Sequence, residues 1–150
     1  MRTIYVGLCV LLCAFVGGSA ALGATRTARS AGTIQTHRLS PERDGGMRCA
    51  GIVVDKKYGD GAITFVNKPS ADAVSGTFKA YYERGTVSGT HKTKVTYNPD
   101  GTATLTDGHL KITNGTGSFK GAKGTGTYSG SATSDGLVTV SYRTTITQAR

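Results

Sequence analysis

From Met47 to the end of the chain, apolar and polar residues alternate one by one, and this period of two constrains the fold more than any other feature. The clearest segment is 138–147 (VTVSYRTTIT), in which the even positions hold all the large apolar residues. Such alternation predicts a strand with one buried and one exposed face. Similar alternation, in places weaker, covers residues 49–54, 63–66, 74–82, 86–91, 94–97, 102–105, 109–113 and 122–132. No segment after residue 47 has helical spacing.

Asp-Gly pairs separate several of these strand candidates, at residues 60–61, 100–101, 107–108 and 135–136. Such pairs are typical of tight β-hairpin turns, and short turns make sequential strands neighbours. About eight strands that share one apolar face must close or stack to bury that face and remove their edges. Glycine on the inner side of 122–132 favours closure. The sequence therefore predicts an all-β fold, a single antiparallel up-and-down β-barrel of about eight strands, with an open sandwich as the alternative.

The first 24 residues are typical of a secretory signal peptide. Arg2 precedes an apolar run over 4–16, and small residues lead to a cleavage site after Ala21 or Ala24. The apolar run is short for a membrane anchor, so we expect no transmembrane span after processing, with an uncleaved membrane helix as the alternative. This predicts a secreted or periplasmic location in a bacterial host.

Residues 25–46 lack apolar periodicity and carry four arginines, which favours a flexible basic linker. The predicted organisation is a signal peptide (1–24), a linker (25–46) and a β-barrel domain (47–150). Without residues 1–24, Cys49 is the only cysteine. It cannot form an internal disulfide, and we expect a small buried side chain.

Basic residues outnumber acidic ones by 18 to 9, which gives a net charge of +9. Several basic residues fall on outward strand positions by parity: Lys79, Lys92, Lys94, Lys111, Lys123 and Arg143. One interpretation is that they keep a β-protein soluble and discourage edge pairing. The other is that they bind an anionic polymer.

The sequence offers little evidence of catalytic chemistry. Five of its nine acidic residues precede glycine in turn-like positions; the other four, expected to be solvated, are Glu42, Asp55, Asp72 and Glu83. No pair of acids is set on one face for acid–base catalysis. The histidines at 37, 91 and 109 lack neighbours at metal-ligand spacing. We therefore expect no catalytic residue, no metal and no cofactor.

The inner face carries several aromatic residues. By parity, Tyr82, Tyr97, Tyr128 and Tyr142 point inward. His91 is in step with Val87 and Gly89, and we expect it at the mouth of the barrel. These five side chains are the candidate ligand-binding residues. The simpler interpretation is that the rings fill a solid barrel; the other is that they line a cavity for a small ligand.

The segment 112–130 (ITNGTGSFKGAKGTGTYSG) is the most distinctive in the chain. It resembles the GGTG-x-F-x-GA-x-G signature of the allene oxide cyclase and dirigent β-barrel superfamily, and the likeness to its small secreted bacterial members of unknown function covers about residues 76–147. The matching residues, which the resemblance implies are scaffold, are Gly115, Thr116, Gly117, Phe119, Gly121, Ala122 and Gly124. Asn114 replaces the usual first glycine. The resemblance implies an eight-stranded barrel, and in plant members the activities are cyclisation of an unstable epoxide and steering of radical coupling. No position matches a family catalytic residue.

These observations favour an exported, non-enzymatic barrel that binds a small apolar or aromatic ligand. The alternative is an envelope or extracellular interaction protein that binds anionic polymers through its basic outer face. A cyclase-like isomerase is a third hypothesis, which rests on the resemblance alone. Homo-oligomerisation is left open by the sequence.

Overall fold

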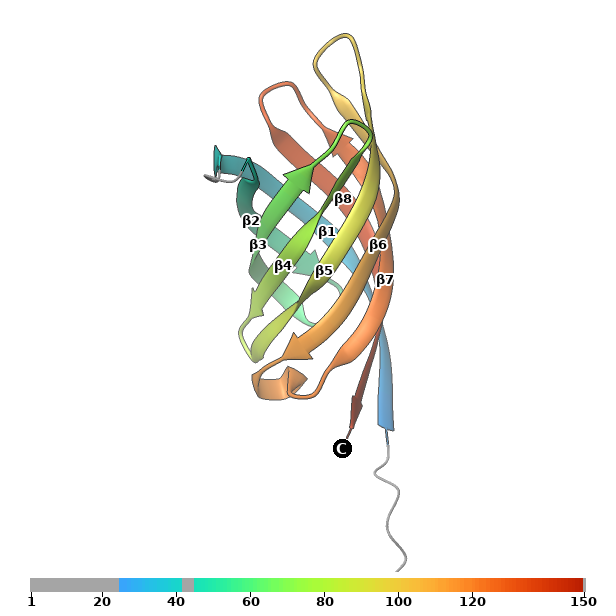
Figure 1. The fold of residues 1–150 in the computed structure, drawn as a ribbon. Helices are drawn as coiled ribbons and strands as arrows, with labels where there is room; N and C mark the ends of the chain where they lie inside the picture. Colours follow the sequence, from blue (N-terminus) through green and yellow to red (C-terminus); the bar gives the residue numbers. More distant parts are fainter. Residues whose placement is uncertain (1–24, 42–44, 150) are drawn as a thin grey trace, which may run out of the picture.

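The computed structural model describes residues 25–41 and 45–149, and they form one closed antiparallel β-barrel (Figure 1). The predicted signal peptide lies outside the described residues. The strands are β1 (Thr25–Pro41), β2 (Met47–Asp55), β3 (Gly59–Pro69), β4 (Ala73–Tyr82), β5 (Gly85–Tyr97), β6 (Ala103–Gly115), β7 (Lys123–Ala132) and β8 (Leu137–Ala149). One short 3-10 helix, η1 (Gly117–Phe119), joins β6 to β7. The predicted all-β, up-and-down, eight-stranded fold is confirmed.

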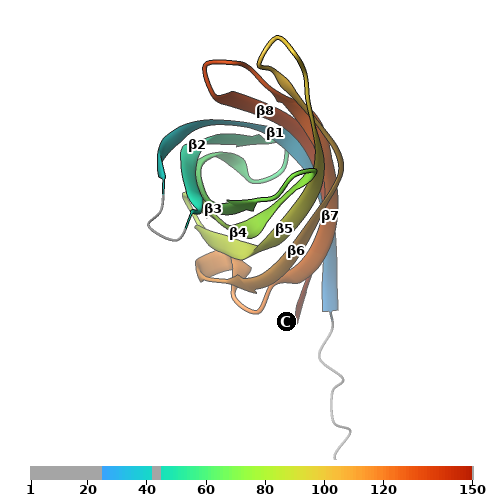
Figure 2. The ribbon, with the colours of Figure 1, turned by 45° about the horizontal axis from the view of Figure 1, so that its top comes forward.

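Each strand pairs with the next one in sequence, and β1 pairs with β8 to close the barrel. The closing register runs from Thr25 opposite Ala149 to His37 opposite Leu137. Figure 2 shows the ring of strands from a tilted view. Closure pairs every described strand on both sides, so none of the eight strands has a free sheet edge. Among the described residues, no helix has the length and hydrophobicity needed to cross a lipid bilayer.

The prediction of a flexible linker over 25–46 is wrong where the structure describes it, because residues 25–41 form β1 between β2 and β8. The inward positions of β1 are Ala28, Ser30, Gly32, Ile34 and Thr36, of which all but Gly32 are buried. Most of these side chains are small or polar, so the strand alternates in burial without alternating in hydropathy. The barrel domain therefore begins at Thr25 and not at residue 47.

The Asp60-Gly61 pair lies inside β3, after the turn over residues 56–58, so it is not the hairpin turn that the sequence predicts. The Asp107-Gly108 pair is not a hairpin turn either. It lies inside β6, where the pairing register with β7 shifts between Leu105 and Gly108 and Asp107 has a φ of 50°. The ring of Tyr128 lies against Gly108, where an added Cβ would come within 2.7 Å of ring carbons. A β-bulge at this point bends one long strand, and the two strand candidates over 102–113 are one element.

The two ends of the barrel differ. At the end that carries η1, here called the plug end, Phe119 is buried and its ring packs against Tyr58 and Tyr82, with centroids 4.9 and 5.5 Å apart. Ala122 beside it is completely buried. The opposite end, here called the mouth end, carries the turns after β3, β5 and β7 (Figure 1). Toward that end the interior rings are Phe65, His91 and Tyr128, with centroids 5.1 Å (Phe65–His91) and 6.1 Å (His91–Tyr128) apart.

Candidate functional site

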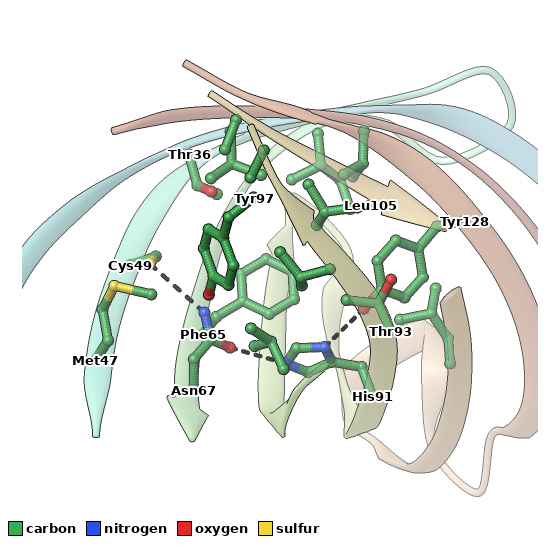
Figure 3. Close-up of a pocket in the computed structure, with 18 residues that line it drawn as sticks. Thr36, Met47, Cys49, Phe65, Asn67, His91, Thr93, Tyr97, Leu105 and Tyr128 are labelled. Carbon is green, nitrogen blue, oxygen red and sulfur yellow. Dashed lines mark hydrogen bonds between the residues drawn. The ribbon is translucent and has the colours of Figure 1, made fainter. Parts of the chain in front are cut away.

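A cavity of about 160 Å³ occupies the mouth half of the barrel. Its wall is mostly aliphatic and aromatic, with Ile34, Phe65, Leu105, Leu110 and Val140 among the lining residues (Figure 3). Tyr97 stands at its rim with 60% of its surface exposed. The expectation that side chains fill the barrel is therefore wrong for this half.

Polar side chains cross one wall of the cavity as a hydrogen-bonded chain. His91, on β5, is 7% exposed, so it lies inside the barrel and not exposed at the mouth as the sequence predicts. Its Nε2 is 2.9 Å from Asn67 Oδ1, and its Nδ1 is 2.9 Å from the Tyr128 hydroxyl. Asn67 Nδ2 donates to Cys49 Sγ at 3.6 Å. Figure 3 shows these side chains directed toward one another from β2, β3, β5 and β7.

The hydrogen bond to Asn67 Oδ1 determines which ring nitrogen of His91 carries the proton. Because Asn67 Oδ1 can only accept, Nε2 of His91 must carry the proton. Burial lowers the pKa of His91 to about 4, so the ring is neutral near pH 7 and Nδ1 accepts from the Tyr128 hydroxyl. The chain therefore runs in one direction, from the Tyr128 hydroxyl through His91 and Asn67 to the Cys49 sulfur.

Tyr128 and Cys49, the two weakly acidic groups of this hydrogen-bonded chain, stay protonated near pH 7. Burial raises the pKa of Tyr128 to about 12. Burial also raises the pKa of the Cys49 thiol, against smaller opposing effects of Asn67 and Arg38. A thiol of this kind stays protonated and unreactive. The predicted burial of Cys49 is confirmed at 3% exposure.

A second polar cluster lies in the plug half of the barrel, around Asp55. This side chain is 5% exposed, so the expectation that it is solvated is wrong. Its Oδ2 accepts short hydrogen bonds from the hydroxyls of Ser30 and Tyr142. Its Oδ1 accepts from the backbone N–H groups of Lys57 and Tyr58 at 2.7 and 2.9 Å. The carboxylate thus ties the β2–β3 turn to β1 and β8.

The two remaining candidate tyrosines belong to this second cluster. Tyr82 and Tyr142 line a cavity of about 40 Å³, which leaves little free space. Burial raises the pKa of Tyr82 to about 12. Burial, followed by the hydrogen bond to Asp55, raises the pKa of Tyr142 as well. This half of the interior is essentially filled by side chains.

The structure therefore divides the five candidate residues. His91, Tyr97 and Tyr128 line the mouth cavity, whereas Tyr82 and Tyr142 lie with Asp55 toward the plug end. Sequence reasoning missed Asn67 and Asp55. It also missed Thr93, a buried residue of the mouth-cavity wall whose hydroxyl donates to the Thr106 carbonyl oxygen at 2.9 Å. Asn67 and Asp55 continue the inward parity of their strands by one step beyond the last apolar residue, and that parity could have identified them.

The residues that match the superfamily signature, which span 115–124, lie at the plug end, away from the mouth cavity. Gly115 ends β6, Gly117 has a φ of 57°, and Phe119 and Ala122 are buried. At Gly117 an added Cβ would come within 2.4 Å of the Arg84 carbonyl oxygen. The motif therefore turns the chain tightly and inserts one aromatic ring into the barrel, which agrees with a scaffold role.

The fold and this site define a class: a closed eight-stranded antiparallel barrel with an apolar cavity at one end and a buried histidine in its wall. No protein-family model, no curated protein and no solved structure matches the chain. The superfamily resemblance of residues 76–147 stays a prediction.

Proposed function

We propose that the protein is an exported binding protein that takes a small, largely apolar molecule, about one aromatic ring in size, into the mouth cavity. The observation that carries this proposal is the cavity itself, whose volume is about 160 Å³. A dry cavity of about 150 Å³ lined by aliphatic and aromatic side chains is enough to bind benzene. Export through residues 1–24 is a prediction from the sequence alone.

The polar chain in the wall supports a ligand that carries one hydroxyl group. The Tyr128 hydroxyl donates its proton to His91. Thr93, which also neighbours this hydroxyl, donates its own proton to the Thr106 carbonyl oxygen, so the Tyr128 oxygen keeps the capacity to accept a hydrogen bond. A phenol or benzylic alcohol could donate to that oxygen while its ring contacts the apolar wall. Phe65 and Leu105 would supply part of this wall.

The protonation states favour binding over catalysis. An efficient acid or base has a pKa near the working pH. His91, with a pKa lowered to about 4, and Tyr128, with a pKa raised to about 12, lie far from neutrality on opposite sides. Both ring nitrogens of His91 are also engaged in hydrogen bonds. These hydrogen-bonded side chains therefore orient a ligand and do not exchange protons with it.

Ala103→Phe should abolish ligand binding, because Ala103 is buried in the cavity wall and the new ring would fill the space. A ligand present at about 100 times its Kd should raise the free energy of unfolding of the unmodified protein by about 2.7 kcal/mol. Thermal unfolding with phenol, p-cresol, toluene and benzyl alcohol measures this stabilisation. Ala62→Phe places the same ring on the exposed outer face of β3 and should leave binding intact.

Absence of stabilisation of the unmodified protein by every compound in this panel would refute the proposal. Equal stabilisation of the Ala103→Phe variant would also refute it, since the ligand would then lie elsewhere. Circular dichroism of both variants checks that the barrel is retained.

Tyr128→Phe should remove the preference for hydroxylated ligands. We expect the unmodified protein to bind p-cresol about tenfold more tightly than toluene, because one hydrogen bond contributes about 1 kcal/mol or slightly more. In the variant, the two affinities should become similar. Titration followed by NMR gives both values, and an unchanged preference would contradict the assigned role of the Tyr128 oxygen.

A further inference from the structure

The outer surface of the barrel carries a groove of about 600 Å³ that is separate from the interior cavities. It crosses β1, β6, β7 and β8 and reaches the β2–β3 turn. Its charged residues are Arg29, Lys56, Lys57 and Arg143, all of them exposed, and His109 lies on β6 beside them. These five side chains come from three strands and one turn, and only the fold brings them together.

The strand register sets the groove residues in two rows. Arg143 lies opposite Thr127, which in turn lies opposite His109. Arg29 lies opposite Thr145, two residues further along β8. Two residues along a strand correspond to about 7 Å, so the arginines occupy successive rows across neighbouring strands.

No aspartate or glutamate is among the described residues that line the groove. Two acids that lie close to groove residues in the sequence, Asp55 and Asp107, are engaged in other contacts. Asp55 lies inside the barrel and accepts four hydrogen bonds, one of them from the groove residue Ser30. Asp107, next to His109 in the chain, forms a salt bridge with Lys94 at 2.8 Å. The groove therefore presents four positive charges without a carboxylate of its own.

Small hydroxyl side chains separate these charges. β7 contributes Thr125 and Thr127, and β8 contributes Thr145. Thr144 also borders the groove, but its side chain has the inward parity of Tyr142 and lines the plug-half cavity. On the inner side of β7 at this point stands Gly126, so neither face of the strand carries a large side chain. A floor of hydroxyl groups between cations matches a chain of sugar hydroxyls that carries carboxylate or sulfate groups, since arginine pairs with such groups through two parallel hydrogen bonds.

We propose that this groove binds a linear anionic polysaccharide. Nucleic acid fits less well, because no phenylalanine, tyrosine or tryptophan is among the described residues that line the groove, and single-stranded bases bind chiefly by stacking on such rings. Of the six basic residues that the sequence places on outward faces, only Arg143 belongs to the groove. The binding surface is thus local and does not extend over the whole basic exterior.

The test compares two double variants that remove the same charge. Arg29→Gln/Arg143→Gln alters the groove, whereas Lys79→Gln/Lys92→Gln alters exposed positions on β4 and β5. Dextran sulfate is the probe, neutral dextran is the backbone control, and a single-stranded oligodeoxynucleotide tests the rival partner. Isothermal titration at several salt concentrations gives the affinity and its salt dependence.

We expect the groove variant to lose at least tenfold in affinity for dextran sulfate and its salt slope to fall by about two, one for each charge removed. The control variant should change the affinity less than threefold, and neutral dextran should not bind. Equal losses in the two double variants would overturn the proposal, because binding would then depend on net charge alone. Tighter binding of the oligodeoxynucleotide than of dextran sulfate, or no binding of dextran sulfate at low salt, would also overturn it.

Discussion

Replacing Asp55 with alanine should lower the free energy of unfolding by about 4 kcal/mol. The reason is the number of donors that the carboxylate satisfies: two hydroxyls, of Ser30 and Tyr142, and two backbone N–H groups. Each buried donor left without an acceptor costs about 1–3 kcal/mol, and both hydroxyl-bearing residues are buried, Ser30 at 8% and Tyr142 at 5% exposure. Urea unfolding at pH 7 measures the loss.

Two further variants separate this effect from a general weakness of the β2–β3 hairpin. Asp60→Ala removes an exposed carboxylate from the same hairpin and should change stability by less than about 0.5 kcal/mol. Asp55→Asn keeps the shape but turns one acceptor into a donor, so its loss should lie between the other two. If Asp55→Ala were as stable as Asp60→Ala, the carboxylate would not hold this end of the barrel together.

The fold could be predicted from the sequence because most of its strands alternate apolar and polar residues. Residues 138–147 place every large apolar side chain on one face, and β8 has that orientation in the structure. β1 could not be predicted in this way, because its inward positions hold alanine, serine, glycine and threonine as well as one isoleucine. A narrow closed barrel can bury small polar side chains beside its neighbours, so a strand can form without an alternating hydropathy pattern.

The candidate site was only partly accessible for a different reason. Parity predicts whether a side chain points inward, and it does so correctly for His91 and Tyr128. It does not predict the height of a residue along the barrel axis, which depends on the register of every strand pair and on bulges such as that at Asp107. This is why Tyr82 and Tyr142 were grouped with a cavity that they do not line. The bond between His91 and Asn67 likewise depends on the β3–β4–β5 registers.

Lowering the pH from 7 to 4 should destabilise the protein by about 3 kcal/mol through His91 alone. In the folded barrel the pKa of His91 is lowered to about 4, whereas in the unfolded chain it returns to about 6.5. Below pH 6.5 the unfolded state therefore binds the proton that the folded state excludes. Stability is lost as the pH falls through this window, and the loss is complete below about pH 4.

Comparison with His91→Gln isolates this contribution, because glutamine has no charge at any of these pH values. Carboxylates that titrate over the same range are common to both proteins, so their effects cancel in the difference. Urea unfolding of both proteins at pH 7, 5.5 and 4 should show a steeper decline for the unmodified protein, with the curves converging as the pH falls. Parallel declines would mean that His91 accepts a proton while folded, and its hydrogen bond with Tyr128 would then have to reverse, with Nδ1 donating to the Tyr128 oxygen.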